Sequence, residues 1–285
     1  MNRIAILSMD IEDWYHLDYF AGNLVDISQT MLDGLEVYRE ILTNYQISSS
    51  YFVLGELIIP LARTLHQLAE EGADIGVHGW NHMRPLLMEP MKFKTELERT
   101  KKVLEDVVQK PVLGYRAPCY SLDRERLETV RDIGFAYDSS RILFKEHPLY
   151  SVLNITGFFE QIPNVFRSDD FFEFQLSSLP ILGRNVPISG GGYIRILPWF
   201  LMDKLIKKYL CHNEIYMFYI HPFELSRKRH PLLPKGISVS TRMRFTLGLG
   251  GVEKKLHKLI QLLKAEGYEI ITFSDLRQRL LFLEE

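Results

Sequence analysis

The sequence predicts an α/β fold in which helices cover a parallel sheet or barrel. Apolar runs typical of buried strands alternate with segments of helical period along the first half of the chain. This alternation is the pattern of parallel sheets, because their crossover connections are helices. The chain of 285 residues, with 46% apolar and 25% charged residues, is long enough to bury a full core in one large domain.

The predicted elements follow one another with recognisable start and stop signals. Strands are expected at residues 3–9, 49–54, 73–77, 112–115, 135–137, 215–220 and 268–272. Helices are expected at residues 30–45, 56–71, 89–109, 123–133, 197–210, 253–266 and 274–281. Gly72, Gly134 and Gly267 each end a helix, as glycine commonly does just after the last turn.

Two stretches depart from this rhythm. Residues 139–196 contain several prolines and the run Gly190-Gly191-Gly192, and we interpret them as an insertion or an elaborated segment of the barrel. Residues 226–246 form a basic, proline-bearing loop, interpreted as solvated, with a basic rim for an anionic substrate or lipid headgroup as the alternative. No repeat or linker divides the chain, so a single domain over residues 1–285 is expected.

Composition excludes several classes of function. The 34 Lys and Arg residues against 36 Asp and Glu leave a net charge of −2, which gives no global preference for nucleic acid. Cys119 and Cys211 form no C-x-x-C pattern, and we expect both as thiols in a reducing compartment. No apolar stretch is long enough for a membrane span or a signal peptide, so a cytoplasmic protein is expected; the oligomeric state is left open.

Polar side chains gather where the predicted strands end. They are the acidic cluster Asp10-Ile11-Glu12-Asp13, the pair His78 and His82, and the single residues Arg116, Asp138 and His221. In a parallel barrel these strand ends converge on one face, which is where active sites lie.

His78 and His82 make a metal site the first hypothesis. Positions four apart on a helical turn lie about 5–6 Å from each other, so two imidazoles can reach one divalent ion, although an H-x3-H pair also occurs as ordinary histidines. A carboxylate from residues 10–13 would complete a catalytic site, and a second carboxylate there could act as general base on water. Zn²⁺ is the default ion, with Co²⁺, Ni²⁺, Mn²⁺ or Fe²⁺ as alternatives.

Arg116 and His221 have candidate roles beside such a site. Arg116 could pair with the base carboxylate, and Pro118 fixes the backbone so that the next amide can point into the pocket. His221 ends an apolar run, which suits either a buried core histidine or a general acid that protonates a leaving amine.

Several motifs together resemble the polysaccharide deacetylase family, also called NodB-homology or carbohydrate esterase family 4. The segments that carry the resemblance are Leu7-Ser8-Met9-Asp10, the histidine pair, Arg116-Ala117-Pro118 and Tyr219-Ile220-His221-Pro222. The start D-I-E-D-W-Y-H, the segment R-A-P-C-Y-S and residues 137–140 and 190–195 look like the branch that accompanies bacterial exopolysaccharide and surface-polysaccharide gene clusters. The resemblance implies a distorted (β/α)7-type barrel and metal-dependent removal of acetyl groups from N-acetylated sugars.

The resemblance also implies roles for individual residues. Those that match the family's reaction chemistry are Asp10 as base, Arg116 as the residue orienting it, His78 and His82 as metal ligands, His221 as general acid and the Cys119 amide as oxyanion donor. Substrate contacts are expected from Cys119, Tyr120, Trp14, Asp138, Tyr193 and Arg195.

The acidic cluster departs from the family pattern. The family has two adjacent aspartates, the second binding the metal, whereas Ile11 occupies that second place here. If the strand continues, Glu12 points to the same side as Asp10 and becomes the ligand. We favour a turn after Ile11, which would bring Asp13 to the metal and Trp14 beside the site as a sugar platform.

The sequence therefore predicts an N-deacetylase acting on an amino-sugar residue of a bacterial surface or exported polysaccharide. Its substrate would be the glycan or a lipid-linked or nucleotide-linked precursor, handled in the cytoplasm or at the surface of the inner membrane. The alternatives are hydrolysis of another carbon–nitrogen bond, in a formamide or cyclic amide, and a catalytically inactive glycan-binding barrel.

Overall fold

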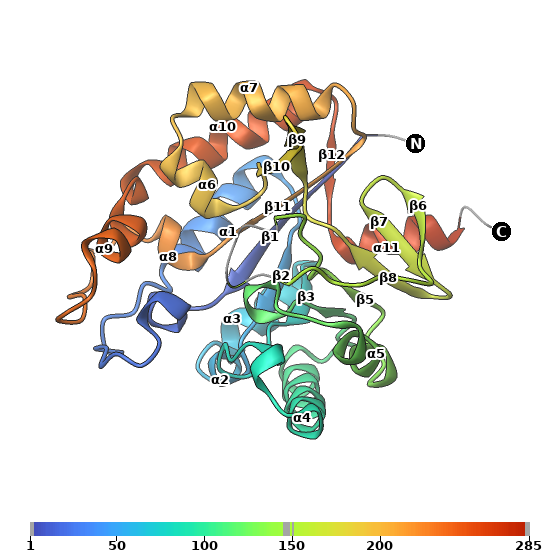
Figure 1. The fold of residues 1–285 in the computed structure, drawn as a ribbon, viewed down its shortest axis with the longest axis horizontal. Helices are drawn as coiled ribbons and strands as arrows, with labels where there is room; N and C mark the ends of the chain where they lie inside the picture. Colours follow the sequence, from blue (N-terminus) through green and yellow to red (C-terminus); the bar gives the residue numbers. More distant parts are fainter. Residues whose placement is uncertain (1–2, 145–148, 150, 283–285) are drawn as a thin grey trace.

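A curved, mainly parallel sheet forms the centre of the computed structural model, which describes residues 3–144, 149 and 151–282 (Figure 1). Within those residues ten strands join in the order β11-β1-β2-β3-β4-β5-β8-β7-β6, with β12 also paired to β1. Their bounds are β1 Ile4–Ile11, β2 Ser50–Val53, β3 Asp74–Val77, β4 Gly114–Tyr115, β5 Tyr137–Asp138, β6 Phe159–Ile162, β7 Val165–Ser168, β8 Phe171–Phe174, β11 Ile215–Ile220 and β12 Glu269–Ile271. The predicted barrel-type α/β fold is confirmed.

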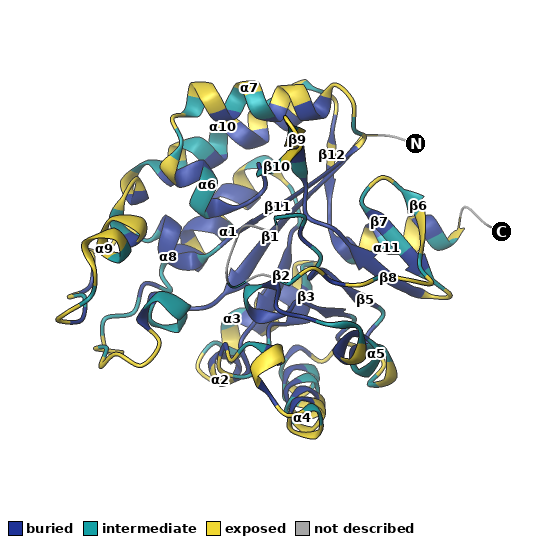
Figure 2. Cartoon of the chain, viewed as in Figure 1, coloured by how far each residue is buried: buried dark blue, intermediate teal, exposed yellow. Residues whose placement is uncertain are grey.

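Helices pack around the sheet and leave their outer faces in solvent (Figure 2). They are α1 Gly34–Tyr45, α2 Gly55–Ile58, α3 Ala62–Glu70, α4 Pro90–Val108, α5 Arg124–Asp132, α6 Gly191–Ile196, α7 Trp199–Leu210, α8 Pro222–Leu225, α9 Val239–Thr246, α10 Val252–Ala265 and α11 Phe273–Phe282. None of the helices in the described ranges is long and apolar enough to cross a membrane.

The alternation of side chains along β1 separates two cores. Ala5, Leu7 and Met9 pack in the large cluster between the sheet and the helices, whereas Ile4 and Ile6 belong to the cluster inside the curl. Successive side chains of a strand point to opposite faces, so Ser8 and Asp10 continue the inner face. The inner cluster also contains Phe273, Leu276 and Leu280 of α11.

Strand register aligns the carboxyl ends of the parallel strands. Met9 pairs with Ile220 in β11, Asp10 pairs with Phe52 in β2, and Val77 of β3 pairs with Tyr115 of β4. The residues that immediately follow these strands therefore meet at one end of the curl, as the parallel topology predicts.

Some predicted elements differ in detail. The helix expected at residues 56–71 is split into α2 and α3 around Pro60, because proline cannot donate an amide hydrogen bond within a helix. Residues 139–196 contain an antiparallel extension of the sheet, β6 to β8, the hairpin of β9 (Ser178–Ile181) and β10 (Arg184–Pro187), and α6. The expected loop at residues 226–246 contains α9.

Candidate active site

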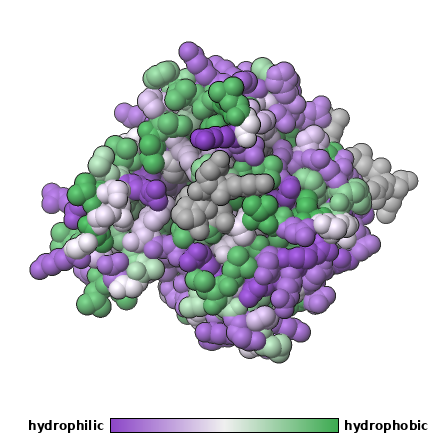
Figure 3. All heavy atoms as spheres, viewed as in Figure 1, coloured by the Kyte–Doolittle hydropathy of each residue, from purple (hydrophilic) through white to green (hydrophobic). Residues whose placement is uncertain are grey.

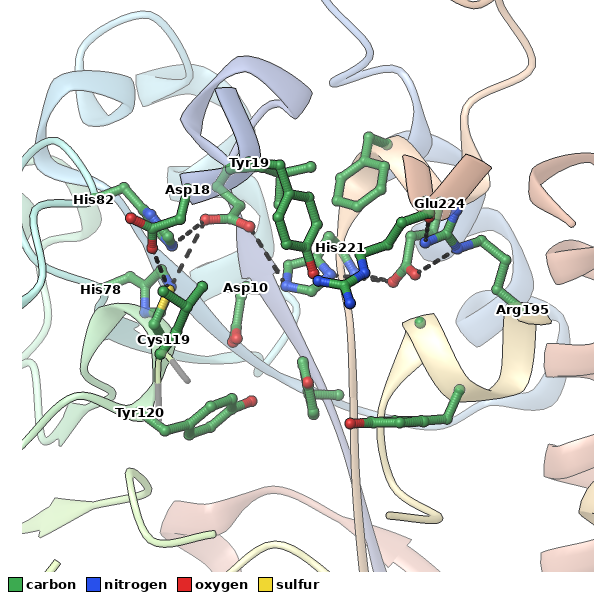
Figure 4. A pocket seen from close by; sticks show the side chains of 18 of the residues that line it. Asp10, Asp18, Tyr19, His78, His82, Cys119, Tyr120, Arg195, His221 and Glu224 are labelled. Carbon is green, nitrogen blue, oxygen red and sulfur yellow. Dashed lines mark hydrogen bonds and ion pairs between the residues drawn. The ribbon is translucent and has the colours of Figure 1, made fainter. Parts of the chain in front are cut away.

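A cavity of about 420 Å³ opens at the carboxyl ends of the strands. Its wall includes most of the predicted site: Asp10, Glu12, His78, His82, Cys119, Tyr120, Tyr193, Arg195 and His221. Figure 4 shows Asp10, the two histidines of the pair and His221 facing a common space. Asp10 lies on β1, His78 and His82 follow β3, and His221 follows β11. These strand ends are far apart in sequence, and the pairing of the strands in the sheet brings them together.

Asp10 is held by a buried ion pair with Arg116. The Arg116 Nη1 donates to Oδ1 of Asp10 at 2.6 Å and to the hydroxyl of Ser8 at 3.0 Å, and both charged side chains are almost fully buried. Burial lowers the pKa of Arg116, but the neighbouring Asp10 charge outweighs it and raises that pKa. Asp10 is therefore presented to the cavity beside a permanent cation.

The orientation of Arg116 is set by its other contacts. Nε donates to the carbonyl of Ser139 and Nη2 to its hydroxyl, at 3.1 and 3.0 Å, while the guanidinium carbon lies 4.2 Å from the centre of the Phe52 ring. A planar fork fixed on three sides cannot follow movements of Asp10, so it fixes the carboxylate in one position.

His78 and His82 lie close together, but not on a helical turn as expected. The chain from Gly79 to His82 is a loop in which both of these residues have positive φ, 80° and 63°. The two rings are 5.5 Å apart between centroids. The four-residue spacing of His78 and His82 was therefore informative, but the prediction that they lie on one helical turn was wrong.

Glu12 completes the histidine pair. Its Oε2 lies 2.6 Å from Nε2 of His82 and 4.0 Å from Nε2 of His78, and all three side chains are buried. One potential ligand atom from each of the three falls within 4.8 Å of the others. Two imidazoles and one carboxylate are a common donor set for a catalytic divalent cation.

The hydrogen bonding of His78 leaves a lone pair free toward the cavity. Nδ1 lies 2.8 Å from the backbone carbonyl of Arg116, and a carbonyl can only accept, so this nitrogen carries the proton. Burial lowers the pKa of His78 to about 4, so the ring is neutral near neutral pH. Nε2 is then an unprotonated donor atom, as metal ligation requires.

Glu12 also has the properties of a metal ligand. Burial raises the pKa of its carboxyl, but the charges of His82 and His221 outweigh this and hold the pKa well below its usual range. Although His82 is close, Glu12 Oε2 has no aligned hydrogen-bond donor within the described part of the chain. A buried, ionised carboxylate oxygen that accepts no hydrogen bond and lies between two imidazoles is a suitable ligand for a divalent cation.

The expectation that Asp13 binds the metal does not fit its position. Its Oδ1 accepts hydrogen bonds from the amides of Trp14 and Met31 at 2.8 and 2.9 Å, and Oδ2 accepts one from the Thr30 hydroxyl. Asp13 is thus the N-cap of the 3₁₀ turn Trp14–His16. The chain does turn after Ile11, but the turn takes Asp13 away from the histidines and leaves Glu12 beside them.

His221 lies beside Glu12 and contacts a second carboxylate through its other ring nitrogen. Nε2 lies 3.4 Å from Oε1 of Glu12, and Nδ1 lies 3.1 Å from Oε2 of Glu224. Burial lowers the pKa of His221, but the hydrogen bond to Glu224 and the charges of Glu12, Glu224 and Asp10 outweigh it and raise the pKa to about 9. The ring therefore carries a proton near neutral pH.

Comparisons with known proteins find a polysaccharide deacetylase match in the first half of the chain. Residues 33–137 match the family profile described as polysaccharide deacetylase, and residues 140–270 match a domain of unknown function, DUF3473. A peptidoglycan deacetylase of Helicobacter pylori is 23% identical over 107 residues, which are 38% of this chain and 36% of that protein. The match over residues 33–137 confirms the resemblance to the polysaccharide deacetylase family that the motifs indicated.

Two solved structures with the same fold are described in different ways, one as a deacetylase and one as a pseudoenzyme. A Mycobacterium smegmatis structure described as a polysaccharide deacetylase superposes with a TM-score of 0.62 at 15% identity, covering 99% of this chain and 92% of that one. A Bacillus anthracis pseudoenzyme of carbohydrate esterase family 4 superposes with a TM-score of 0.56 at 11% identity, covering 97% and 66%. At these identities the likeness shows the fold. The chain spans about a third of the length of its Helicobacter relative.

Glu224 is a residue of the cavity wall that sequence reasoning missed. A signal was present, because Glu224 follows His221 by three residues at the start of α8, with Pro222 between them, and this spacing matches a capping box. Nε of Arg195 lies 3.4 Å from Oε1 of Glu224 and holds its other side. Arg195 also donates to the backbone carbonyls of Phe245 and Arg244, so it joins α9 to the site.

In the run Gly190-Gly191-Gly192, the middle glycine packs directly against Glu224. A Cβ on Gly191 would lie 1.8 Å from Oε2 of Glu224, whereas a Cβ on Gly192 would meet nothing within 4 Å. Gly191 is therefore required for the contact between Glu224 and His221, and Gly192 is not.

Cys119 places an unsatisfied amide at the cavity. Its φ of 53° breaks the short 3₁₀ turn after Pro118, and the next amides, of Tyr120 and Ser121, donate to the carbonyls of Ala117 and Pro118. The Cys119 amide itself has no acceptor among the residues that the structure describes. Because Cys119 lines the cavity, its amide stays a predicted oxyanion donor.

The Cys119 thiol is partly buried and hydrogen-bonded, which disfavours the reactive thiolate. Its Sγ donates to Oδ2 of Asp18 at 2.6 Å, and burial together with the Asp18 charge raises the pKa of the thiol well above its usual range. Asp18 was not foreseen from the sequence, because nothing local marks it as part of the site. A thiol rather than a thiolate is expected there.

Two predicted substrate contacts lie outside the cavity. Trp14 is fully buried, packs on Phe20 and Phe245, and donates from Nε1 to the carbonyl of Gln29 at 2.6 Å. It supports the wall from behind instead of forming a sugar platform. The aromatic surfaces that do line the cavity include Tyr19, Tyr120, Tyr193 and Tyr219.

Asp138 is also structural. It accepts from both the amide and the hydroxyl of Ser140, and the same hydroxyl accepts the Ala117 amide at 2.8 Å. Asp138 and Glu173 are neighbours on paired strands, and burial raises both of their pKa values, that of Glu173 well above its usual range. Asp138 therefore fixes the segment that carries Arg116 and Cys119.

We expect Trp14→Ala to reduce stability without removing the site's chemistry. Deleting a fully buried indole from an aromatic cluster should cost about 3–5 kcal/mol of unfolding free energy, measured by urea denaturation. Tyr193→Ala, in the cavity wall, is the contrasting variant and should weaken substrate binding more than stability. A Trp14 variant of normal stability and impaired sugar binding would restore the platform interpretation.

Proposed function

We propose that the protein is a metal-dependent hydrolase that removes N-acetyl groups from an amino-sugar residue of a bacterial surface or exported polysaccharide, or of its precursor. The observation that carries the proposal is the arrangement of three groups around one cavity: the Asp10–Arg116 pair, the Glu12–His78–His82 cluster and His221. An amide hydrolase needs a base, an electrophile site and an acid, and each has a candidate here.

Glu12, His78 and His82 would hold a divalent cation, most simply Zn²⁺. When bound, such an ion supplies Lewis-acid polarisation of the acetamide and acidifies the attacking water. Asp10 accepts the proton of that water, and the Arg116 guanidinium holds the carboxylate in position. The Cys119 amide donates to the oxygen that becomes negative as the carbonyl carbon turns tetrahedral.

His221 completes the reaction at the nitrogen. Its Nε2 proton passes to the departing sugar amine as the carbon–nitrogen bond breaks, leaving acetate and a free amine. Glu224 keeps Nδ1 protonated and so fixes which nitrogen faces the substrate. Base and acid thus follow paired strands, β1 and β11, and each is positioned by a partner of its own, Arg116 and Glu224.

Support for the acetylated glycan comes from the family and from the named Helicobacter relative, a peptidoglycan deacetylase. The exopolysaccharide role, and a lipid-linked or nucleotide-linked precursor as substrate, follow from the branch that the motifs resemble. Tyrosines in the wall offer flat, amphipathic surfaces of the kind on which sugar rings pack.

The decisive experiment measures acetate release from N-acetylated glucosamine oligosaccharides by the metal-free and the metal-reconstituted protein. Release is expected only with metal, and N-formylated oligosaccharides should react more slowly if acetyl is the natural group. Faster deformylation would favour the alternative carbon–nitrogen hydrolase. Metal and glycan binding without turnover of either substrate would instead identify an inactive glycan-binding barrel, like the pseudoenzyme that shares the fold.

Glu224→Gln should move the alkaline limb of the pH–rate profile to lower pH. An acid works only while protonated, so activity falls as pH rises through the pKa of His221, which Glu224 helps to raise. Removing that charge should lower the limb by about 1–3 pH units. Gly191→Ala, which displaces Glu224, should act in the same direction, and Gly192→Ala is the matched control. An unchanged limb in Glu224→Gln would separate Glu224 from the proton on His221.

A further inference from the structure

The segment of residues 226–252 is strongly basic within a chain of net charge −2. It contains six Lys and Arg residues and no Asp or Glu: Arg227, Lys228, Arg229, Lys235, Arg242 and Arg244. The net charge of the whole chain does not reveal this local positive charge. The segment includes α9 and the irregular chain before it, and Figure 1 shows it at the periphery of the molecule.

Half of these cations are already used inside the protein. Arg227 pairs with Glu40 and Glu253, Lys228 contacts Asp33, and Arg244 lies over the Tyr19 ring. The other three, Arg229, Lys235 and Arg242, are exposed and have no acidic partner within the described part of the chain. They are free to meet an external anion.

Large apolar side chains are exposed among these free cations. Leu232 is 78% exposed, Val239 74% and Met243 56%. Their neighbours in sequence, Leu233, Ile237 and Phe245, pack inward against the cluster that contains Trp14. The segment is therefore anchored on one side, and its outer side, here called the basic–apolar edge, consists of Arg229, Leu232, Lys235, Val239, Arg242 and Met243.

A second loop extends the apolar part of this edge. The Leu232 amide donates to the side chain of Gln29, which follows the exposed Leu24 and Ile27. Asp26 is the acid in that loop, and it is held by Ser28 and Gln29. Figure 3 shows apolar and polar surface interspersed on the side of the molecule where Figure 1 places α9.

We propose that the basic–apolar edge docks the protein on the surface of an anionic lipid bilayer. Arg229, Lys235 and Arg242 would contact headgroup phosphates, while Leu232, Val239 and Met243 enter the boundary between headgroups and acyl chains. A soluble polyanion would explain the cations but would leave those apolar side chains in water. The bilayer accounts for both, because its surface offers negative charge and an apolar layer a few ångströms apart.

Docking would also orient the cavity. Arg244, on the same helix α9, lines the cavity, and Arg195 ties the end of α9 to Glu224. Part of the edge and part of the cavity wall therefore belong to one short helix, so a bound protein would hold its site close to the lipid surface. The inference concerns where the protein binds and holds whether or not the acyl group is acetyl.

The test is sedimentation of the full chain with vesicles of phosphatidylglycerol and phosphatidylcholine, compared with vesicles of phosphatidylcholine alone. Binding is expected to the anionic vesicles and to weaken with salt. The variant R229E/K235E/R242E should lower the partition coefficient by roughly 100-fold or more, since each cation near an anionic surface contributes about a fivefold effect. L232S/V239S/M243S should lower it at constant charge and constant salt.

Matched controls separate this surface from general charge. K92E/K94E/K102E makes the same charge change on exposed lysines of α4, at a different part of the molecule (Figure 1), and should bind like wild type. Circular dichroism melting checks that every variant is folded. Absence of binding to anionic vesicles overturns the proposal. So does equal binding of a soluble acidic polysaccharide with no effect of the serine substitutions, which would make the edge a polyanion site.

Discussion

Glu12→Gln should lose metal affinity by at least about 100-fold and lose metal-dependent turnover with it. The physical reason is that Glu12 supplies the only buried carboxylate oxygen between His78 and His82 within the described part of the chain, and an amide oxygen carries no charge to hold a cation. Isothermal titration with Zn²⁺ into the metal-free protein measures the affinity directly. The His78→Ala and His82→Ala variants should behave in the same way, because two ligands hold a divalent ion poorly.

Asp13→Ala is the matched control for this result. It removes a cap that satisfies the Trp14 and Met31 amides and the Thr30 hydroxyl, so unfolding free energy should fall by about 2–4 kcal/mol. Metal affinity measured well below the melting temperature should stay near wild type. The opposite pattern, with the ion lost in a stable Asp13 variant and retained in Glu12→Gln, would return the ligand to Asp13.

Asp10→Asn should lower turnover by roughly 10²–10⁴ while the metal remains bound. The asparagine keeps the shape of the carboxylate and its contact with Arg116 but cannot accept a proton from water. Metal content after dialysis and the single-turnover rate of acetate release are the two measurements. A variant that loses the ion, yet turns over normally per ion retained, would make Asp10 a ligand and not the base.

The role of Arg116 can be separated from that of Asp10. Arg116→Lys keeps a positive charge but loses the fork that binds Ser8, Asp10 and Ser139 together. We expect the base to be less well oriented, with a fall in turnover smaller than that of Asp10→Asn and with metal affinity unchanged. Arg116→Met should also destabilise the fold, because it leaves the Asp10 carboxylate buried without a partner.

Much of the site followed from local sequence. The period of two along β1 put Ser8 and Asp10 on one face, and this face turned out to be the inner one because Ile4 and Ile6 precede them. Strand ends identified His78, Arg116 and His221, since parallel topology brings such ends together whatever the loops do. Glu224 could have been added from its capping spacing.

What the sequence by itself determined was therefore the fold class, the family motifs and the side chains that meet at the strand ends. Tertiary structure alone decided between Glu12 and Asp13, because Asp13 is captured by the amide of Met31 and the hydroxyl of Thr30 in a loop 17–18 residues away. It likewise decided that Trp14 is buried, since Phe245 covers it from the far end of the chain. Period and propensity act within an element, whereas these contacts depend on where distant loops pack, and no local pattern carries that information.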